Sequence, residues 1–169
     1  MALTIAVDDP GAKDVQDLLA VHLAFCHTSS PPEYSHALDA VGLLDPALTV
    51  VSAREDSPLL GIGAIKQLSA AHGEVKSMHT REAARGRGVG RAILVRLLAL
   101  ASERGYRQVS LETGTTPHFA AARALYADMG FTSCAPFSDY VDSPYNTFMT
   151  IWLDTKAPRP MVRAVEPKG

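Results

Sequence analysis

The chain has 169 residues, of which 47% are hydrophobic and 20% are charged, and its formal net charge is −2 at pH 7. This length and balance are typical of one globular domain with a single core, and they exclude a wholly disordered, collagen-like or coiled-coil protein. A general nucleic-acid binder is usually basic, so the slightly acidic total argues against that class.

Cysteine content and apolar runs bear on the compartment. Two cysteines are too few for a disulfide framework, which favours a reducing environment. The first residues hold no basic stretch and reach Asp8 and Asp9 at once, which argues against a secretion signal. No apolar run approaches the roughly 20 residues of a membrane span. We therefore expect a cytoplasmic protein without a membrane partner.

Hydrophobic periodicity and turn residues predict six elements in the first half of the chain. The first helix rests on apolar residues at helical spacing from Val15 to Cys26, with Asp9 as its cap and Pro10 in its first turn. In chain order the elements are a strand at Leu3–Val7, this helix, a short helix at Glu33–Leu43, and strands at Leu48–Ala53, Leu59–Leu68 and Glu74–Thr80.

Five elements follow, and glycines mark their ends most clearly. They are a helix at Gly88–Arg104, a strand at Gln108–Thr113, a helix from Thr116 to a stop at Gly130, and strands at Phe137–Val141 and Thr147–Leu153. This order predicts an α+β (mixed α/β) domain on a single sheet. We expect the domain to cover residues 1–156, and the proline-bearing residues 157–169 to form a flexible tail.

The stretch Arg85–Gly90 is the most informative part of the chain. It reads Arg-Gly-Arg-Gly-Val-Gly between a predicted strand and a predicted helix. Glycines let the backbone approach a ligand closely, and the first turn of a helix offers unpaired N–H groups at the positive end of its dipole. Residues 76–107 contain eight basic and two acidic side chains, so positive charge is concentrated here. These features predict a site for a compact polyphosphate.

Two common phosphate motifs do not fit this stretch. The chain has no Gly-Lys-Ser/Thr of a P-loop, and Arg91 stands where G-x-G-x-x-G needs its last glycine. As Arg-x-x-Gly-x-Gly, the stretch instead resembles the Gln/Arg-x-x-Gly-x-Gly/Ala signature of the GNAT-superfamily N-acetyltransferases. The resemblance continues through the strand before it, through Leu111-Glu112-Thr113, and through the LYxxxGF-like segment 125–131.

The resemblance implies a fold and a reaction. The fold is a single, mostly antiparallel sheet splayed between its fourth and fifth strands and flanked by about four helices. The reaction is direct transfer of the acetyl group of acetyl-CoA to a primary amine of a small molecule or protein. The glycine-rich loop would wrap the pyrophosphate, and the fourth strand would pair with the pantetheine arm, an N–H near Met78 polarising the thioester carbonyl. The residues so implied in cofactor binding are Met78, His79, Thr80, Arg85, Gly86, Arg87, Gly88, Val89, Gly90 and Arg91.

Three residues are candidates for proton transfer. Glu74 lies eleven residues before Arg85, the separation at which histone-acetylating family members carry a catalytic glutamate, and a partly desolvated carboxylate can act as general base. Tyr126 matches the family tyrosine near the thioester sulfur and would protonate the thiolate. The alternatives are a strand-end glutamate with water as the base, and a tyrosine that only packs its ring. Glu112 is a second candidate carboxylate.

The acceptor is less clearly indicated. Phe119 stands where the family often has an asparagine that bonds the cofactor. We expect the acceptor between residues 27–36 and 137–146, where the aromatic and acidic side chains of the second stretch would suit a cationic amine, unless that stretch is an ordinary hairpin. His22 and Cys26 have the i, i+4 spacing of metal ligands, but no second pair accompanies them, so we predict no metal.

Two other classes stay open from the sequence. One is a non-catalytic acyl-CoA-binding or sensor protein of the same fold, and the other is an unrelated nucleotide-binding domain. For the acetyltransferase we expect an amine acceptor as the partner and no nucleic acid, and the sequence leaves a homodimer open.

Overall fold

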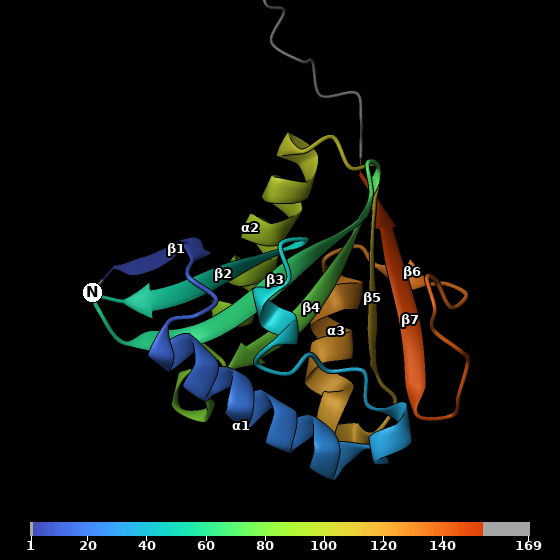
Figure 1. The fold of residues 1–169 in the computed structure, drawn as a ribbon, viewed down its shortest axis with the longest axis horizontal. Helices are drawn as coiled ribbons and strands as arrows, with labels where there is room; N and C mark the ends of the chain where they lie inside the picture. Colours follow the sequence, from blue (N-terminus) through green and yellow to red (C-terminus); the bar gives the residue numbers. More distant parts are fainter. Residues whose placement is uncertain (1, 154–169) are drawn as a thin grey trace, which may run out of the picture.

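A seven-stranded sheet runs through the computed structural model, which describes residues 2–153 (Figure 1). Its order is β1-β2-β3-β4-β5-β7-β6, and every neighbouring pair is antiparallel except β4 and β5. The strands are β1 (Leu3–Asp8), β2 (Leu48–Glu55), β3 (Leu59–Ser69), β4 (His72–Thr80), β5 (Gln108–Gly114), β6 (Thr132–Ser133) and β7 (Asn146–Trp152). The expected α+β class with one mostly antiparallel sheet is confirmed.

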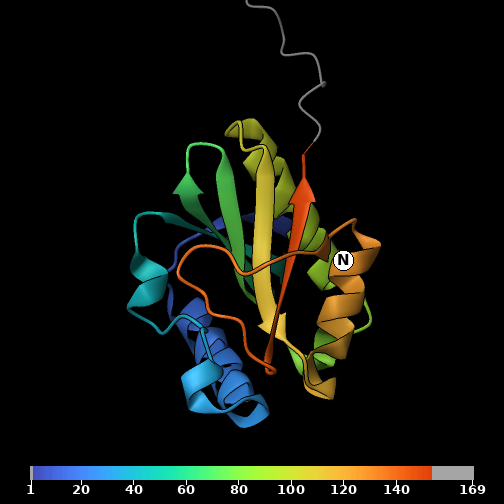
Figure 2. The same cartoon turned by 90° about the vertical axis from the view of Figure 1, so that its right-hand side faces the viewer.

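Helices cover both faces of this sheet (Figures 1 and 2). They are α1 (Lys13–Ser29), α2 (Val89–Glu103) and α3 (Ala120–Asp128). Because successive strand residues point to opposite faces, Val50 packs with α1 while Val51 packs with α2. This explains why the strands read as continuous apolar runs rather than as alternating ones.

The parallel pair β4 and β5 separates after a short contact. Its pairing runs from His72 opposite Gln108 to Val75 opposite Leu111, whereas β4 continues to Thr80 and β5 to Gly114. The second half of β4 therefore has a strand partner on the β3 side only. The expected splay between the fourth and fifth strands is confirmed, and α3 lies behind the widening gap in Figure 1.

A β-bulge sits where this separation begins. The pairing register shifts so that Gly63 of β3 faces two residues of β4, Ser77 and Met78. Ser77 has a φ of 56°, in the left-handed region that side-chain-bearing residues rarely adopt. A Cβ at position 63 would lie 2.6 Å from Sδ of Met78 and 2.7 Å from Cγ2 of Ile93, so only glycine fits.

The prediction of a helix at 33–43 is wrong. That segment contains only two 3₁₀ turns joined by irregular backbone, so residues 2–153 hold three α-helices where about four were expected. Ser35 has extended backbone (φ −89°, ψ 118°) that ends the first turn, and the carbonyl oxygen of Tyr34 accepts from Nδ2 of Asn146 instead of from a helical N–H. The 3₁₀ turns of the described residues are η1 (Pro32–Tyr34), η2 (Gly42–Leu44), η3 (Glu82–Ala84) and η4 (Pro117–Phe119).

The prediction of a strand at 137–141 is also wrong. The segment is a loop that crosses the face of β5 in Figure 2, and the short β6 pairs with β7 in its place. Pro136 lacks an N–H donor, and Ser138 has a φ of 53°, so neither residue suits a regular ladder. Residues 154–156 of the expected domain and the expected tail at 157–169 lie outside the described residues. Within 2–153, no helix combines the length and the apolar character needed to cross a membrane.

We expect Gly63→Ala to lower the free energy of unfolding by about 1–3 kcal/mol, the usual cost of an extra methyl group in a packed core. Urea denaturation measures this. Gly11→Ala is the control, because its added Cβ would meet only Oδ1 of Asp9 at 3.3 Å and Cδ2 of Leu44 at 3.9 Å. Equal stability of the two variants would contradict the requirement for glycine at the bulge.

Candidate active site

A cleft of about 530 Å³ opens where β4 and β5 diverge. Its walls come from both strands, from the loop and first turn of α2, from α3, and from α1 with the segment after it. Of the twelve site residues expected from the sequence, eleven line this cleft, and the exception is Arg87. The fold thus brings together residues that are up to 52 positions apart in the chain, from Glu74 to Tyr126. What each of them binds stays a prediction.

The glycine-rich loop forms one end of the cleft. Gly86 and Gly88 have φ values of 76° and 79°, which glycine adopts without strain. Gly88 is the N-cap of α2, and the first turn of α2 contains no acidic residue. The positive end of the helix dipole and the unpaired N–H groups therefore face the cleft without a counter-charge of their own, which is the arrangement that holds phosphate groups.

The three arginines of this loop have different surroundings. Arg87 forms an ion pair with Glu55, and Arg91 forms one with Asp128. The Nε–H of Arg85 donates to the carbonyl oxygen of Thr80 at 3.3 Å, and among residues 2–153 no carboxylate lies within 4 Å of its guanidinium. Arg85 is therefore the loop arginine whose charge is available to an anion in the cleft.

Glu74 belongs to a three-residue network. Its side chain is buried, with 4% exposed, and Oε2 accepts the Tyr140 hydroxyl proton at 2.5 Å and a Lys76 Nζ proton at 3.2 Å. Lys76 also donates to the Tyr140 hydroxyl oxygen at 2.7 Å. Burial and the neighbouring Glu74 charge raise the pKa of Tyr140, so this phenol stays protonated. One side of the Glu74 carboxylate is thus occupied, and Oε1 has no hydrogen bond within residues 2–153.

Glu112 lies in the same cleft with a different partner. Its Oε1 accepts a proton from Nδ2 of Asn146 at 2.5 Å, and the same amide group donates to the carbonyl oxygen of Tyr34 at 3.0 Å. In the described part of the chain Glu112 forms no ion pair. Burial raises the pKa of the Glu112 carboxyl above its ordinary value, although the Asn146 hydrogen bond opposes this.

Tyr126 occupies the buried side of α3 and is only 5% exposed. The sequence pattern places Leu125 and Met129 on that side, yet both are half-buried and Tyr126 alone is fully covered. Its ring packs edge-on against Phe131, with the centroids 5.9 Å apart. Burial, and then the nearby Glu112, raise the pKa of Tyr126, so its hydroxyl keeps its proton at neutral pH. A protonated hydroxyl in a cleft can act as an acid.

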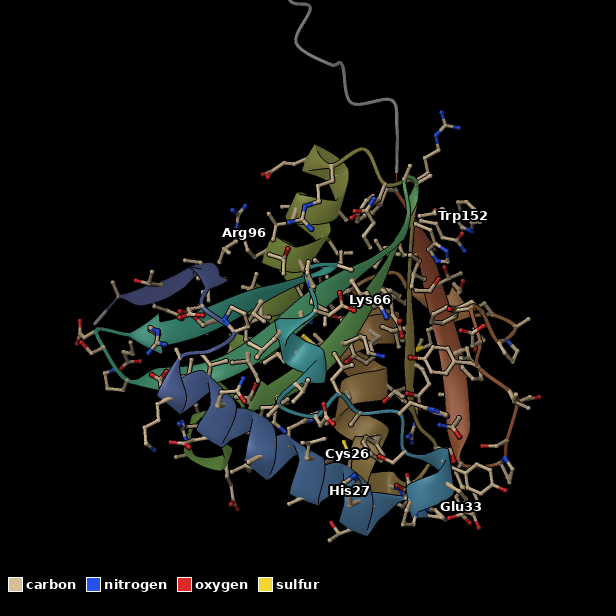
Figure 3. All side chains as sticks on the ribbon, in the orientation of Figure 1. Cys26, His27, Glu33, Lys66, Arg96 and Trp152 are labelled. Atoms are coloured by element: carbon tan, nitrogen blue, oxygen red, sulfur yellow. The ribbon has the colours of Figure 1, made fainter. Side chains whose placement is uncertain are left out.

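A histidine pair covers the cleft from the α1 side. Nδ1 of His22 lies 3.0 Å from Nδ1 of His79, and Nε2 of His22 lies 3.6 Å from Sγ of Cys26, which Figure 3 labels on α1. Burial lowers the pKa of His22 to about 3 and that of His79 to about 4, and it raises the pKa of Cys26 to about 11. All three groups are therefore neutral at pH 7. Among residues 2–153, no three His, Cys, Asp or Glu side chains form a group that could hold a metal ion.

The acceptor side differs from expectation in one segment. Ser30 and residues 34–36, within the expected stretch 27–36, line the cleft, but no residue of 137–146 does. The acids of that second stretch, Asp139 and Asp142, are exposed outside the cleft, and its aromatic Phe137 packs on Phe148 of the sheet at 6.0 Å between centroids. The carboxylates that do line the cleft come from β4 and β5.

Phe119 also lines the cleft, at the position where the family often has an asparagine. Its ring lies 5.3 Å from that of Phe25, between centroids, and it covers Gly114, where an added Cβ would be 2.1 Å from Cδ2 of the ring. This position therefore gives the cleft an apolar wall in place of a side-chain hydrogen bond.

Sequence reasoning missed three contributions. The pairing of Glu74 with Lys76 had a signal, since residues i and i+2 of a strand share a face. The contacts of Tyr140 with Glu74 and of Asn146 with Glu112 join residues 66 and 34 positions apart, and no local pattern indicates them.

Comparison with known proteins identifies the family of this chain. Residues 13–131 match the model of the acetyltransferase (GNAT) family. The uncharacterized N-acetyltransferase YsnE of Bacillus subtilis (strain 168) is 42% identical over 146 residues, which are 86% of this chain and 97% of that protein. The IAA acetyltransferase of Azospirillum brasilense is 33% identical over 148 residues, 87% of this chain and 95% of that protein.

Solved structures share the fold. A Klebsiella pneumoniae protein of the acyl-CoA N-acyltransferase type superposes with a TM-score of 0.75 at 27% identity, covering 90% of this chain and 98% of that one. A GNAT family acetyltransferase from Elizabethkingia anophelis, solved with acetyl-CoA bound, gives 0.67 at 15% identity, covering 89% and 98%. The chain belongs to the GNAT family and is an acyltransferase. The resemblance noted in the sequence is confirmed.

The raised pKa of Glu112 predicts a pH-dependent stability. The folded state holds the carboxyl proton more tightly than the unfolded chain, so stability falls as pH rises from the ordinary carboxyl range through the raised pKa. We expect Glu112→Gln, which is neutral and can still accept from Asn146, to have a higher Tm than the wild type at about pH 7–8 and an equal one near about pH 4.

Thermal unfolding at several pH values measures this difference. Asp142→Asn serves as the control, because this substitution removes the same formal charge from an exposed position. A Glu112→Gln variant that is less stable than the wild type at every pH would show that the ionised carboxylate stabilises the fold.

Proposed function

We propose that the protein transfers the acetyl group of acetyl-CoA directly to a primary amine of a small molecule or protein. One observation carries this proposal. The N-terminus of α2, capped by Gly88, and the buried, protonated Tyr126 line the same cleft where β4 and β5 separate. The acetyl-CoA bound to the Elizabethkingia anophelis protein of the same fold supports it.

In this proposal the cofactor binds along the loop and β4. Backbone N–H groups from Gly86 to Arg91 hold the pyrophosphate, and Arg85 reaches a further phosphate oxygen. The pantetheine arm then takes the place of the missing strand partner along residues 78–80 of β4. The bulge at Ser77 rotates the backbone there, so that an N–H near Met78 can donate to the thioester carbonyl oxygen as negative charge develops on it.

The transfer needs two proton movements. The acceptor nitrogen attacks the thioester carbonyl carbon, the C–S bond breaks, and the thiolate of CoA takes the Tyr126 hydroxyl proton. The acceptor attacks as the neutral amine, and the proton that its nitrogen loses on attack passes to Glu74, whose Oε1 is open, directly or through water. Tyr126 regains a proton from solvent once CoA leaves. Glu112 is the second candidate base, favoured by the observation that Lys76 and Tyr140 already occupy Oε2 of Glu74.

Acetyl-CoA is expected to raise the Tm of the protein, whereas ATP and NAD at the same concentration do not. At a hundred times its Kd a ligand adds about 2.7 kcal/mol of stability. Gly88→Ala should weaken this effect, since position 88 has positive φ and starts the anion-binding turn. Unchanged Tm with acetyl-CoA would refute the proposal, and binding without release of CoA in the presence of amines would favour the sensor alternative.

Tyr126→Phe is expected to lower kcat by about a hundredfold or more, the usual contribution of a positioned general acid, with little change in the Kd of acetyl-CoA. Tyr106→Phe is the matched control, because Tyr106 is equally buried but lies outside the cleft. Thiol release from acetyl-CoA measures both variants. Full turnover by Tyr126→Phe would show that Tyr126 is not the general acid. A loss of turnover in Glu112→Gln without a loss in Glu74→Gln would identify Glu112 as the base.

A further inference from the structure

The acceptor end of the cleft contains two carboxylates and one lysine. Glu74 and Lys76 come from β4, and Glu112 comes from β5, which no longer pairs with β4 at this height. With histidines counted as neutral, these side chains carry a net charge of −1. The cationic groups Arg85 and Arg91 line the opposite end of the cleft, beside the N-terminus of α2.

The lysine is already engaged. Its Nζ donates to Oε2 of Glu74 and to the hydroxyl oxygen of Tyr140, and it lies 5.4 Å from the centre of the Tyr140 ring. Only 11% of the Lys76 side chain is exposed, so it cannot turn toward a ligand without breaking these contacts. The positive charge of Lys76 is therefore neutralised by Glu74, and Lys76 is not free to pair with a ligand carboxylate.

Glu112 is the cleft carboxylate that forms no ion pair within residues 2–153. Its one hydrogen-bond partner in the described residues is the neutral amide of Asn146, and neither Lys76 nor His36 comes within ion-pair distance. Burial raises the pKa of this carboxyl, although the Asn146 hydrogen bond and the more distant charges of His36 and Lys76 lower it. A buried anion without a partner is destabilising until a cation enters the site.

Residues 34–38 form a further wall of the cleft and mix polar with apolar side chains. Tyr34 is fixed to Glu112 through Asn146, and Ala37 and Leu38 follow it along the cleft. His36, whose ring lies 5.0 Å from that of Tyr140, is the one other titratable side chain of this segment that faces the cleft. This wall offers contact area for a hydrocarbon or aromatic body and no fixed cation for an acid group.

We propose that the acceptor is a primary monoamine with an apolar body and no carboxylate next to the amine, and that its ammonium pairs with Glu112 before losing a proton. The inference rests on the proposed acetyl transfer. An α-amino acid carries the same ammonium, but its carboxylate would be placed beside Glu74 and Glu112 without a cation to receive it, and such like-charge contacts oppose binding.

Matched pairs of acceptors that differ only in this carboxylate test the inference. They are 2-phenylethylamine and phenylalanine, tryptamine and tryptophan, and 3-methylbutylamine and leucine. We expect at least one amine to be acetylated with kcat/KM roughly a hundredfold above that of its amino acid, which is the range of one buried charged hydrogen bond. Equal or better use of the amino acids, or use of none of the three amines, overturns the inference.

Two variants connect the preference to Glu112. Glu112→Gln keeps the hydrogen bond to Asn146 and removes the charge, so the binding of the preferred amine to the CoA-loaded protein should weaken roughly tenfold to a hundredfold. Asp139→Asn removes the same charge from the exposed loop and should leave that affinity unchanged. Equal affinities of the two variants for the amine would contradict the pairing.

The outcomes separate this inference from the acetyl transfer on which it rests. If acetyl-CoA neither binds nor is consumed, the proposed function fails first. Consumption of acetyl-CoA with amino acids in preference to amines would keep the function and overturn the acceptor class alone. Indole-3-acetate is included because a relative is named for it, and turnover with this anion in place of the amines would also overturn the class.

Discussion

The short parallel contact between β4 and β5 is the constraint on which the rest of the structure depends. Four residue pairs hold the two halves of the sheet together, and beyond them the strands separate. A strand edge without a partner is normally a liability because its backbone groups stay unpaired. Here that edge faces a cleft, where a ligand of extended shape can take the place of the missing strand.

The bulge and the packing of α2 make this separation possible. Gly63 leaves room for Met78 and for the side chains of α2, while the positive φ of Ser77 redirects β4. The N-cap of the same helix is Gly88, so the element that supports the divergent strand also supplies the N-terminus for which anion binding is proposed. The packing of α2 in the core and the position of its N-terminus in the cleft are therefore parts of one arrangement.

The sequence predicts these backbone-determined parts well and the side-chain networks poorly. Glycine positions report backbone conformation directly, so Gly86 and Gly88 indicated the turn, and strand periodicity indicated the sheet. The segments 33–43 and 137–141 were mispredicted because the extended backbone of Ser35 and the positive φ of Ser138 interrupt regular structure, and their apolar patterns do not show this. The partners of Glu74 and Glu112 arrive from a loop and from β7 through tertiary folding, which no local spacing encodes.

The two ends of the cleft also present different kinds of polar group, main-chain at one end and side-chain at the other. At the loop, the groups that face the cleft are largely main-chain N–H donors, which every residue other than proline carries, so substitutions outside Gly86 and Gly88, whose positive φ favours glycine, leave them in place. At the other end, the polar groups are the side chains of Glu74, Lys76 and Glu112, and the amide of Asn146 joins three distant segments. In the proposed reaction, substitutions at these few side chains would therefore change the choice of acceptor while the donor end stays the same.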